Sequence, residues 1–147
     1  MILCDVNVLL YAFRSDSHNH KAYRDWLTDR LNGPENFGVS ELVLSALIRI
    51  ATHPRVFKQP SALEEAFAFA DAIRSRPTAV AVNQGRRHWH IFAEISAQSG
   101  ARGNLIPDAY FAALAIESGC EWITTDRDYA RFPKLRWSHP LEGRKPR

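Results

Sequence analysis

Short apolar stretches alternate with longer helical stretches along the whole chain, and this alternation limits the fold more than any other feature. The strand-like stretches are 1–6, 36–39, 79–82, 120–125 and 135–137. Apolar residues recur at helical spacing in the segments between them, which are 20–31, 40–51, 61–74, 86–99 and 107–119, with a turn into helix at 7–13. Strands that alternate with helices of this length form βαβ units. We therefore expect an α/β fold with a central, mainly parallel sheet flanked by helices.

Two helical segments begin with residues that are suited to capping. Ser40 stands at the N-cap position of the helical segment 40–51, and its hydroxyl can accept from a free backbone amide. Segment 61–74 opens with Ser61-Ala62-Leu63-Glu64, which matches a capping box. The apolar stripe that follows is expected to pack into the core, and it consists of Leu63, Ala66, Phe67, Ala70 and Ile73.

Length and composition fit one globular domain. A chain of 147 residues can bury about two-thirds of its unfolded surface, and 46% hydrophobic with 24% charged residues is ordinary. No apolar run is long enough to cross a bilayer, and the first residues reach an acid without a basic region, so we expect neither a membrane segment nor a signal peptide. We expect a cytoplasmic protein with one domain at 1–141 and a basic, disordered tail at 142–147.

The charge and the cysteines narrow the chemistry. A net charge of +3 permits nucleic-acid binding without establishing it. Cys4 and Cys120 are too few for a disulfide framework or a zinc site, and we expect both to be small buried side chains. His88 and His90 lie two residues apart in a predicted helix, so they point to different faces and are not expected to share an ion.

Four acidic residues stand at the ends of predicted buried elements. Asp5 ends the first apolar strand and Asp126 ends the strand-like 120–125, whereas Glu41 and Asp108 open helical runs. In an α/β fold such ends can converge on one cleft. Carboxylates that share a cleft repel one another unless cations neutralise them. Hard carboxylate oxygens suit magnesium or manganese, so the sequence predicts a divalent-metal site and phosphate chemistry.

Three of these acids also have a purely structural explanation. Asp5 could form an Asx turn with Asn7. If the backbone stays extended, both side chains lie on one side of the strand, and Asn7 can support Asp5 by a hydrogen bond. Glu41 and Asp108 lie in first helical turns, where the helix dipole favours an acid. Both lead faces that are predicted to be packed, however, and a charge at the head of a buried face needs a partner.

The last acidic segment contains two aspartates. Thr124 and Asp126 can project on the same side of the strand end, and Asp128 lies two residues further on. A helix cap or an Asx turn explains either aspartate singly, but less readily both. We expect Asp126 to be a metal ligand and Asp128 to support the site or to bind a second ion.

The order of these motifs resembles a PIN domain, and more narrowly the VapC-type toxins of bacterial VapBC toxin–antitoxin modules. The matching positions are Asp5-Val6-Asn7, Glu41, Pro107-Asp108, the run from Thr124 to Tyr129, and Arg131-Phe132-Pro133. The resemblance extends over 1–141. Each motif is weak alone, but the order of the set is specific.

The resemblance implies a metal-dependent endoribonuclease that binds one or two magnesium or manganese ions. It also implies a small VapB-type antitoxin as partner and a homodimer. The acidic quartet of the family corresponds to Asp5, Glu41, Asp108 and Asp126, and the polar residues that support its first and last members correspond to Asn7 and Thr124. Tyr129 stands where the family more often has phenylalanine. No acid of the quartet is missing, so nothing in the pattern suggests an inactive copy.

Substrate binding would need basic or aromatic groups near the acids. Arg102 lies in a glycine-flanked loop before Asp108, and Arg127 follows Asp126, so both are candidates for RNA binding. Trp89 could stack on a base, but its helical spacing with neighbouring apolar residues favours a place in the core.

Other functions remain open at this point. A receiver domain or phosphatase on a similar frame would need an Asp-x-Asp-x-Thr motif or a well-placed lysine, and Lys134 is poorly placed. A non-catalytic module that binds RNA or a protein partner is the stronger alternative. Apolar residues on 20–31 or 61–74 could serve a dimer or antitoxin contact, although core packing explains them equally.

Overall fold

A single parallel sheet forms the centre of the molecule. The structure is a computed structural model that describes residues 1–143. The strands are β1 (Ile2–Cys4), β2 (Phe37–Val39), β3 (Ala79–Ala81), β4 (Glu121–Ile123) and β5 (Trp137–Ser138). Their order is β3-β2-β1-β4-β5, and every neighbouring pair is parallel. The predicted α/β class is confirmed, and each strand-like stretch of the sequence contributes to a strand.

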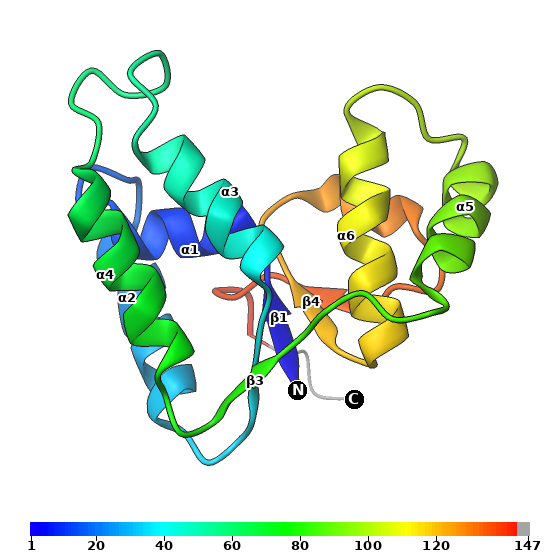
Figure 1. Cartoon of the computed structure of the whole chain (residues 1–147), viewed down its shortest axis with the longest axis horizontal. Helices are drawn as coiled ribbons and strands as arrows, with labels where there is room; N and C mark the ends of the chain where they lie inside the picture. Colours follow the sequence, from blue (N-terminus) through cyan, green and yellow to red (C-terminus); the bar gives the residue numbers. More distant parts are fainter. Residues whose placement is uncertain (144–147) are drawn as a thin grey trace.

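Helices cover the sheet on both sides. They are α1 (Val6–Phe13), α2 (His20–Asn32), α3 (Glu41–Ala51), α4 (Leu63–Arg74), α5 (His88–Ser99) and α6 (Leu105–Ser118), with the short 3-10 helix η1 (Arg127–Arg131). Figure 1 shows α1–α4 on one side of the sheet and α5 with α6 on the other. None of the helices within residues 1–143 combines the length and apolar character needed to span a bilayer.

The topology explains why acidic strand ends come together. The chain adds β2 and β3 on one side of β1, then β4 and β5 on the other, so β1 lies at the point where the strand order reverses. Ligands of open parallel sheets bind outside the carboxyl ends of the strands at such a switch point. Cys4 is paired with Ile123 in the β1–β4 register, so Asp5 and Thr124 follow at the same edge.

The side of the sheet below α6 is packed with small and aromatic residues. Four alanines of α6 are fully buried and allow close approach to the sheet: Ala109, Ala112, Ala113 and Ala115. Trp122 of β4 is also fully buried and stacks on Phe111, with 5.7 Å between ring centroids. Tyr129 and Phe132 extend this aromatic layer. The layer fixes the first turn of α6 and η1 against the end of β4.

Some local predictions were wrong. Ser61 does not cap α4, which begins at Leu63 after Ala62; the Ser61 hydroxyl instead accepts from Arg14 Nη1 at 3.0 Å. Ser40 occupies the N-cap position of α3 without a side-chain hydrogen bond. Leu63 and Phe67 do not pack into the core, being 53% and 49% exposed. The stripe is narrower than predicted because only one side of α4 meets the rest of the molecule.

The two cysteines and the C-terminal segment were also the subject of predictions from the sequence. Cys4 and Cys120 are buried and unpaired, as expected. Of the predicted disordered tail 142–147, residues 144–147 lie outside the described part of the chain. Glu142, the first residue of that segment, forms an ion pair with Arg127.

Candidate metal centre

Asp5 is the buried anchor of the site. It directly follows β1 and caps α1, and its Oδ1 accepts from the Val6 amide at 2.7 Å. Oδ2 accepts from Thr124 Oγ1 at 2.6 Å. Burial is the main cause that raises the pKa of Asp5 from 3.8 to about 6, and the charges of Asp108 and Asp126 raise it further against the two hydrogen bonds. A buried carboxylate with this pKa is poised to accept a cation.

Thr124 connects Asp5 to the loop after β4. Besides donating to Asp5, its fully buried hydroxyl accepts from the Asp126 amide at 3.0 Å. The Asp126 carboxylate in turn caps η1 by accepting from the Asp128 amide at 2.9 Å. One threonine therefore fixes the relative position of two strand ends that are far apart in sequence.

Asp108 reaches the same region from the first turn of α6. Its Oδ1 lies 3.3 Å from Tyr129 Oη, which donates to it. Burial and, next, the charge of Asp126 raise the pKa of Asp108, with a further contribution from Asp128. Burial likewise raises the pKa of the Tyr129 hydroxyl, so this group stays a donor. The three predicted aspartates are thus brought into electrostatic contact.

Glu41, unlike the three aspartates, lies at the surface and is paired with a basic residue. It is the first residue of α3, as predicted, but its exposed side chain forms an ion pair with Arg74 of α4, with 3.2 Å between Oε1 and Nη2. Both side chains line a groove of about 340 Å³ between α3 and α4, with Leu44, Ile48 and Phe67 among its other walls. Within residues 1–143, no three His, Cys, Asp or Glu side chains are close enough together to hold an ion as they stand. Ion binding would therefore require the aspartate side chains to draw closer together, and Glu41 could join them only by turning away from Arg74.

Asn7 does not support Asp5 in the predicted way. The helix α1 begins at Val6, so the backbone is not extended between the two residues, and no hydrogen bond joins their side chains within the described part of the chain. Asn7 Oδ1 is instead buried without a hydrogen-bond partner. A buried acceptor without a partner is costly unless a donor or a cation completes it.

The chemistry of the donor set fits a hard divalent ion. Asp5, Asp108 and Asp126 offer only carboxylate oxygens, which magnesium and manganese prefer. Two of these carboxyls have raised pKa values that a cation would lower. Asn7 Oδ1 adds a further oxygen that lacks a partner. Asp128 donates its amide to Asp126, and its own carboxylate forms an ion pair with Arg131, with 3.8 Å between Oδ1 and Nε.

The candidate RNA-binding residues differ in whether their side chains are exposed and in whether they are already paired. Arg102 is exposed in the loop before α6. Arg127 is engaged by Glu142. Trp89 was expected in the core and is instead 71% exposed, because α5 presents His88 and Ile95 to its neighbours.

Two contacts of the site were not predicted from the sequence. The first is the hydroxyl of Tyr129 on Asp108, for which the tyrosine in place of phenylalanine was a visible signal. The second is the ion pair between Arg74 and Glu41, which are 33 residues apart. Nothing in the local sequence of either residue indicates this second contact.

The sheet is parallel, and acidic residues follow β1 and β4 and lie in the first turn of α6. This arrangement is typical of a metal-dependent enzyme with an α/β fold. A sequence model of the family described as PIN domain matches residues 2–135. The chain belongs to the PIN domain family. It is 41% identical to the VapC ribonuclease Mb2897 of Mycobacterium bovis over 143 residues, which is 97% of each chain. It is 40% identical to ribonuclease VapC31 of Mycobacterium tuberculosis over 140 residues, 95% of this chain and 99% of the relative.

Solved structures agree on the fold. A chain in the crystal structure of VapBC2 from Rickettsia felis, bound to a DNA fragment from their promoter, superposes with a TM-score of 0.67 at 20% identity, covering 95% of this chain and 98% of that one. The structure of VapBC-1 from nontypeable Haemophilus influenzae gives 0.67 at 16% identity, covering 97% and 100%. At this level of identity the similarity establishes the architecture.

Proposed function

We propose that this chain is an endoribonuclease toxin of the VapC type that hydrolyses RNA phosphodiester bonds with the help of magnesium or manganese ions. One observation carries the proposal. Asp5, Asp108 and Asp126 converge at the carboxyl ends of the central strands, on a chain 41% identical to a VapC ribonuclease over nearly its whole length. Carboxyls that raise one another's pKa are costly for a module that only binds RNA, whereas a metal-dependent nuclease needs them.

The residues of the site have distinct tasks in this proposal. Asp5, Asp108 and Asp126 would hold one or two ions, with Glu41 as a fourth ligand and Asp128 as a supporting or second-ion group. Such an ion would supply activation of a water molecule and stabilisation of charge on the scissile phosphate. Thr124 holds Asp5 and the Asp126 segment in register through the bonds of 2.6 and 3.0 Å. Attack by water, without the ribose 2′-hydroxyl, leaves a 5′-phosphate and a 3′-hydroxyl.

The relatives indicate which protein partner this chain binds. We infer that a VapB-type antitoxin neutralises the chain, since solved relatives are VapBC complexes. The exposed Leu63 and Phe67 of α4 are candidates for that contact or for a homodimer interface. We expect the protein to act in the cytoplasm, where its RNA substrate is made.

Cleavage of RNA by the purified chain tests the proposal. We expect cleavage with magnesium or manganese, none in EDTA, and none by Asp5→Asn at unchanged circular dichroism. Sequencing of the product ends should find 5′-phosphates. Cleavage that persists in EDTA would refute the metal mechanism, and 2′,3′-cyclic phosphate ends would refute attack by water. Tight RNA binding without cleavage under any condition would favour the alternative of a non-catalytic binding module.

A further inference from the structure

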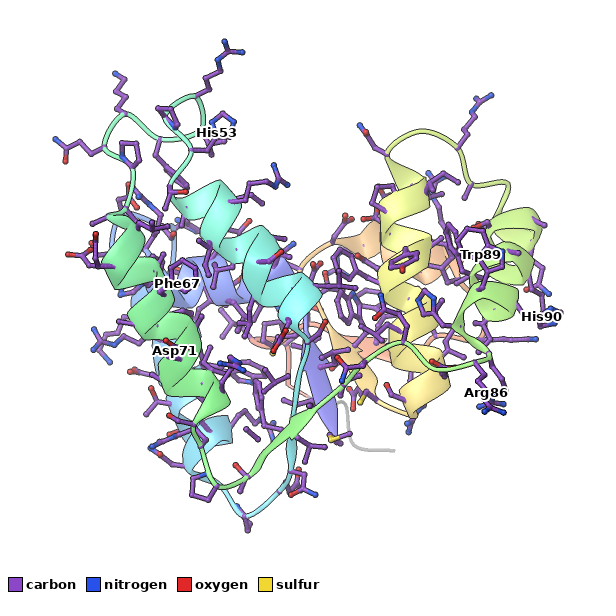
Figure 2. All side chains as sticks on the ribbon, viewed as in Figure 1. His53, Phe67, Asp71, Arg86, Trp89 and His90 are labelled. Atoms are coloured by element: carbon purple, nitrogen blue, oxygen red, sulfur yellow. The ribbon has the colours of Figure 1, made fainter. Side chains whose placement is uncertain are left out.

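An exposed aromatic and basic surface lies at the start of α5, and the metal centre does not use it. We call Arg86, Arg87 and Trp89 the α5 surface. All three side chains are exposed, and 71% of Trp89 faces solvent. Figure 2 shows Arg86, Trp89 and His90 at the α5 end of the molecule, on the other side from Phe67 and Asp71 of α4. Burying this indole against a ligand would gain the free energy of removing its apolar area from water.

The indole of Trp89 rests on a fixed aromatic support. Its ring meets the Phe92 ring edge-on, with 5.5 Å between centroids. Phe92 meets Tyr110 of α6 in the same way at 5.2 Å. Tyr110 Oη accepts from Gln84 Nε2 at 2.9 Å, so the chain before α5 is held to α6 as well. A rigid, exposed ring on such a support is suited to stacking against a flat ligand.

The backbone beside Trp89 is anchored in a way that leaves both arginine side chains free. The Glu117 carboxylate of α6 accepts from the amides of Gly85 at 2.6 Å and Arg87 at 2.9 Å. Neither guanidinium of the α5 surface has a hydrogen bond or ion pair within residues 1–143. The single acid of α5, Glu94, is engaged by Lys134 at 2.6 Å. Within the described part of the chain, the surface therefore presents two guanidinium groups without a paired acid beside an exposed ring, while the Glu117 carboxylate is bound to backbone amides.

We propose that the α5 surface binds a single-stranded segment of RNA, with one base stacked on Trp89 and phosphates bound by Arg86 and Arg87. Aromatic side chains that stack bases, flanked by cations that bind the backbone, are the usual way in which proteins bind single strands. The inference rests on the proposed ribonuclease function and adds a substrate-binding surface to it.

A second copy of this chain fits the surface less well. Across a two-fold axis the same patch meets itself, which would bring four arginine side chains together. Trp89 is also the sole large apolar side chain of α5 that is exposed within the described residues, whereas α4 exposes both Leu63 and Phe67. Charge complementarity therefore favours a polyanion over a protein surface.

The position of the surface indicates which part of the RNA it binds. Asp108 and Tyr110 are two residues apart on α6, so their side chains leave the helix about 200° apart. The α5 surface consequently lies across α6 from the aspartates. It would hold a flank of the RNA and not the scissile phosphate, so its effect should grow with RNA length.

Equilibrium binding of fluorescent single-stranded RNA to the Asp5→Asn protein, which keeps the RNA intact, tests the proposal. Adding Trp89→Ala should weaken binding of a ~16-nucleotide RNA by about tenfold, with a smaller loss for a ~4-nucleotide RNA. Adding Arg86→Ala with Arg87→Ala should lower the slope of log Kd against log salt by about 1.4. Matched controls are Val56→Ala, and Arg55→Ala with Lys58→Ala, in the exposed loop between α3 and α4; these should bind RNA like the parent.

The outcomes separate this inference from the proposed function. Trp89→Ala that binds the longer RNA as tightly as its parent overturns the inference, even if wild type cleaves RNA. A Trp89→Ala protein that becomes monomeric in sedimentation while keeping its RNA affinity assigns the surface to a subunit contact and also overturns it. Failure of the wild type to cleave or bind any RNA would instead refute the proposed function. Trp89→Phe, which retains a ring, should lose less affinity than Trp89→Ala and so excludes a general folding defect.

Discussion

The aspartate cluster and the Glu41–Arg74 pair are built in opposite ways. Asp5 is 7% exposed and both of its oxygens accept hydrogen bonds from fixed groups, the Val6 amide and the Thr124 hydroxyl. Glu41 has a side chain that is 76% exposed and is held by one long, flexible arginine. A buried acid in fixed bonds is preorganised, whereas an exposed ion pair contributes little energy and exchanges readily.

This difference suggests how the site is assembled. The sheet and α6 bring Asp5, Asp108 and Asp126 near enough to raise the pKa of Asp5, and in the proposed site a cation would relieve this charge repulsion. In the proposed site Glu41 would join from the edge of the α3–α4 groove by exchanging Arg74 for the ion. We call Asp5, Asp108 and Asp126 the fixed part of the site and the Glu41–Arg74 pair its adjustable part.

The largest expected effect is on catalysis. Asp108→Asn should lower kcat on RNA on the order of 1000-fold, because several kcal/mol of metal-dependent charge stabilisation depend on this carboxylate. Glu41→Gln should lower kcat less, since its position is adjustable. Single-turnover cleavage at saturating magnesium measures both, with circular dichroism as the folding control. An equal or larger loss for Glu41→Gln would contradict the contrast.

The pH dependence of stability should report the fixed part directly. The folded state of the metal-free protein raises the pKa of Asp5 from 3.8 to about 6, so it binds the proton more tightly than the unfolded state does. The stability that the Asp5 proton contributes is therefore fully present below about pH 4 and is lost as the pH rises through about 6. The loss should be on the order of 3 kcal/mol.

Urea unfolding in EDTA at several pH values measures this loss, and Asp5→Asn is the matched control. The variant should lack that part of the pH dependence and exceed the wild type in stability at pH 7. Identical pH profiles for the two proteins would mean that burial does not raise the pKa of Asp5.

Removing the link between the two strand ends should have a smaller effect. Thr124→Val keeps the shape of a fully buried side chain but leaves Asp5 Oδ2 and the Asp126 amide without their partner. We expect a loss of about 1–3 kcal/mol in the free energy of unfolding, together with weaker manganese binding. Thr124→Ser, which restores the hydroxyl, should recover most of the metal affinity. If serine and valine behaved alike, the hydroxyl would not be the active group.

The smallest expected effect concerns the adjustable part. Arg74→Gln breaks an exposed ion pair and should change the free energy of unfolding by less than about 1 kcal/mol. It should also lower the magnesium concentration needed for half-maximal cleavage, because Glu41 no longer has a competing cation. Arg76→Gln is the matched control, because Arg76 lies two residues after Arg74 but binds Asn32 and not Glu41. A higher magnesium requirement in Arg74→Gln would show that Arg74 orients Glu41 for the site.

The parts of the site that follow from strand order were predictable from the sequence. Parallel strands place their carboxyl ends at one edge, so an acid after β1 and an acid after β4 had to lie close together. The contact of Thr124 with both segments follows from the same register.

Features that depend on the orientation of a helix were not predictable. The apolar spacing of Trp89 and Phe67 indicated a helix correctly but not how wide its buried face would be. The capping pattern at Ser61 failed because Arg14, 47 residues away, takes its hydroxyl. The ion pair of Glu41 with Arg74 likewise depends on how α3 and α4 pack, which no local pattern encodes.

Anomalous scattering from a crystal of the protein soaked in manganese tests the central claim most directly. We predict at least one manganese peak with ligand oxygens from Asp5, Asp108 and Asp126, and Glu41 turned from Arg74 toward the ion. The same soak of Asp5→Asn should show a weaker peak or none. A wild-type crystal without a peak among these aspartates, from protein that cleaves RNA, would contradict the claim that they form the metal centre.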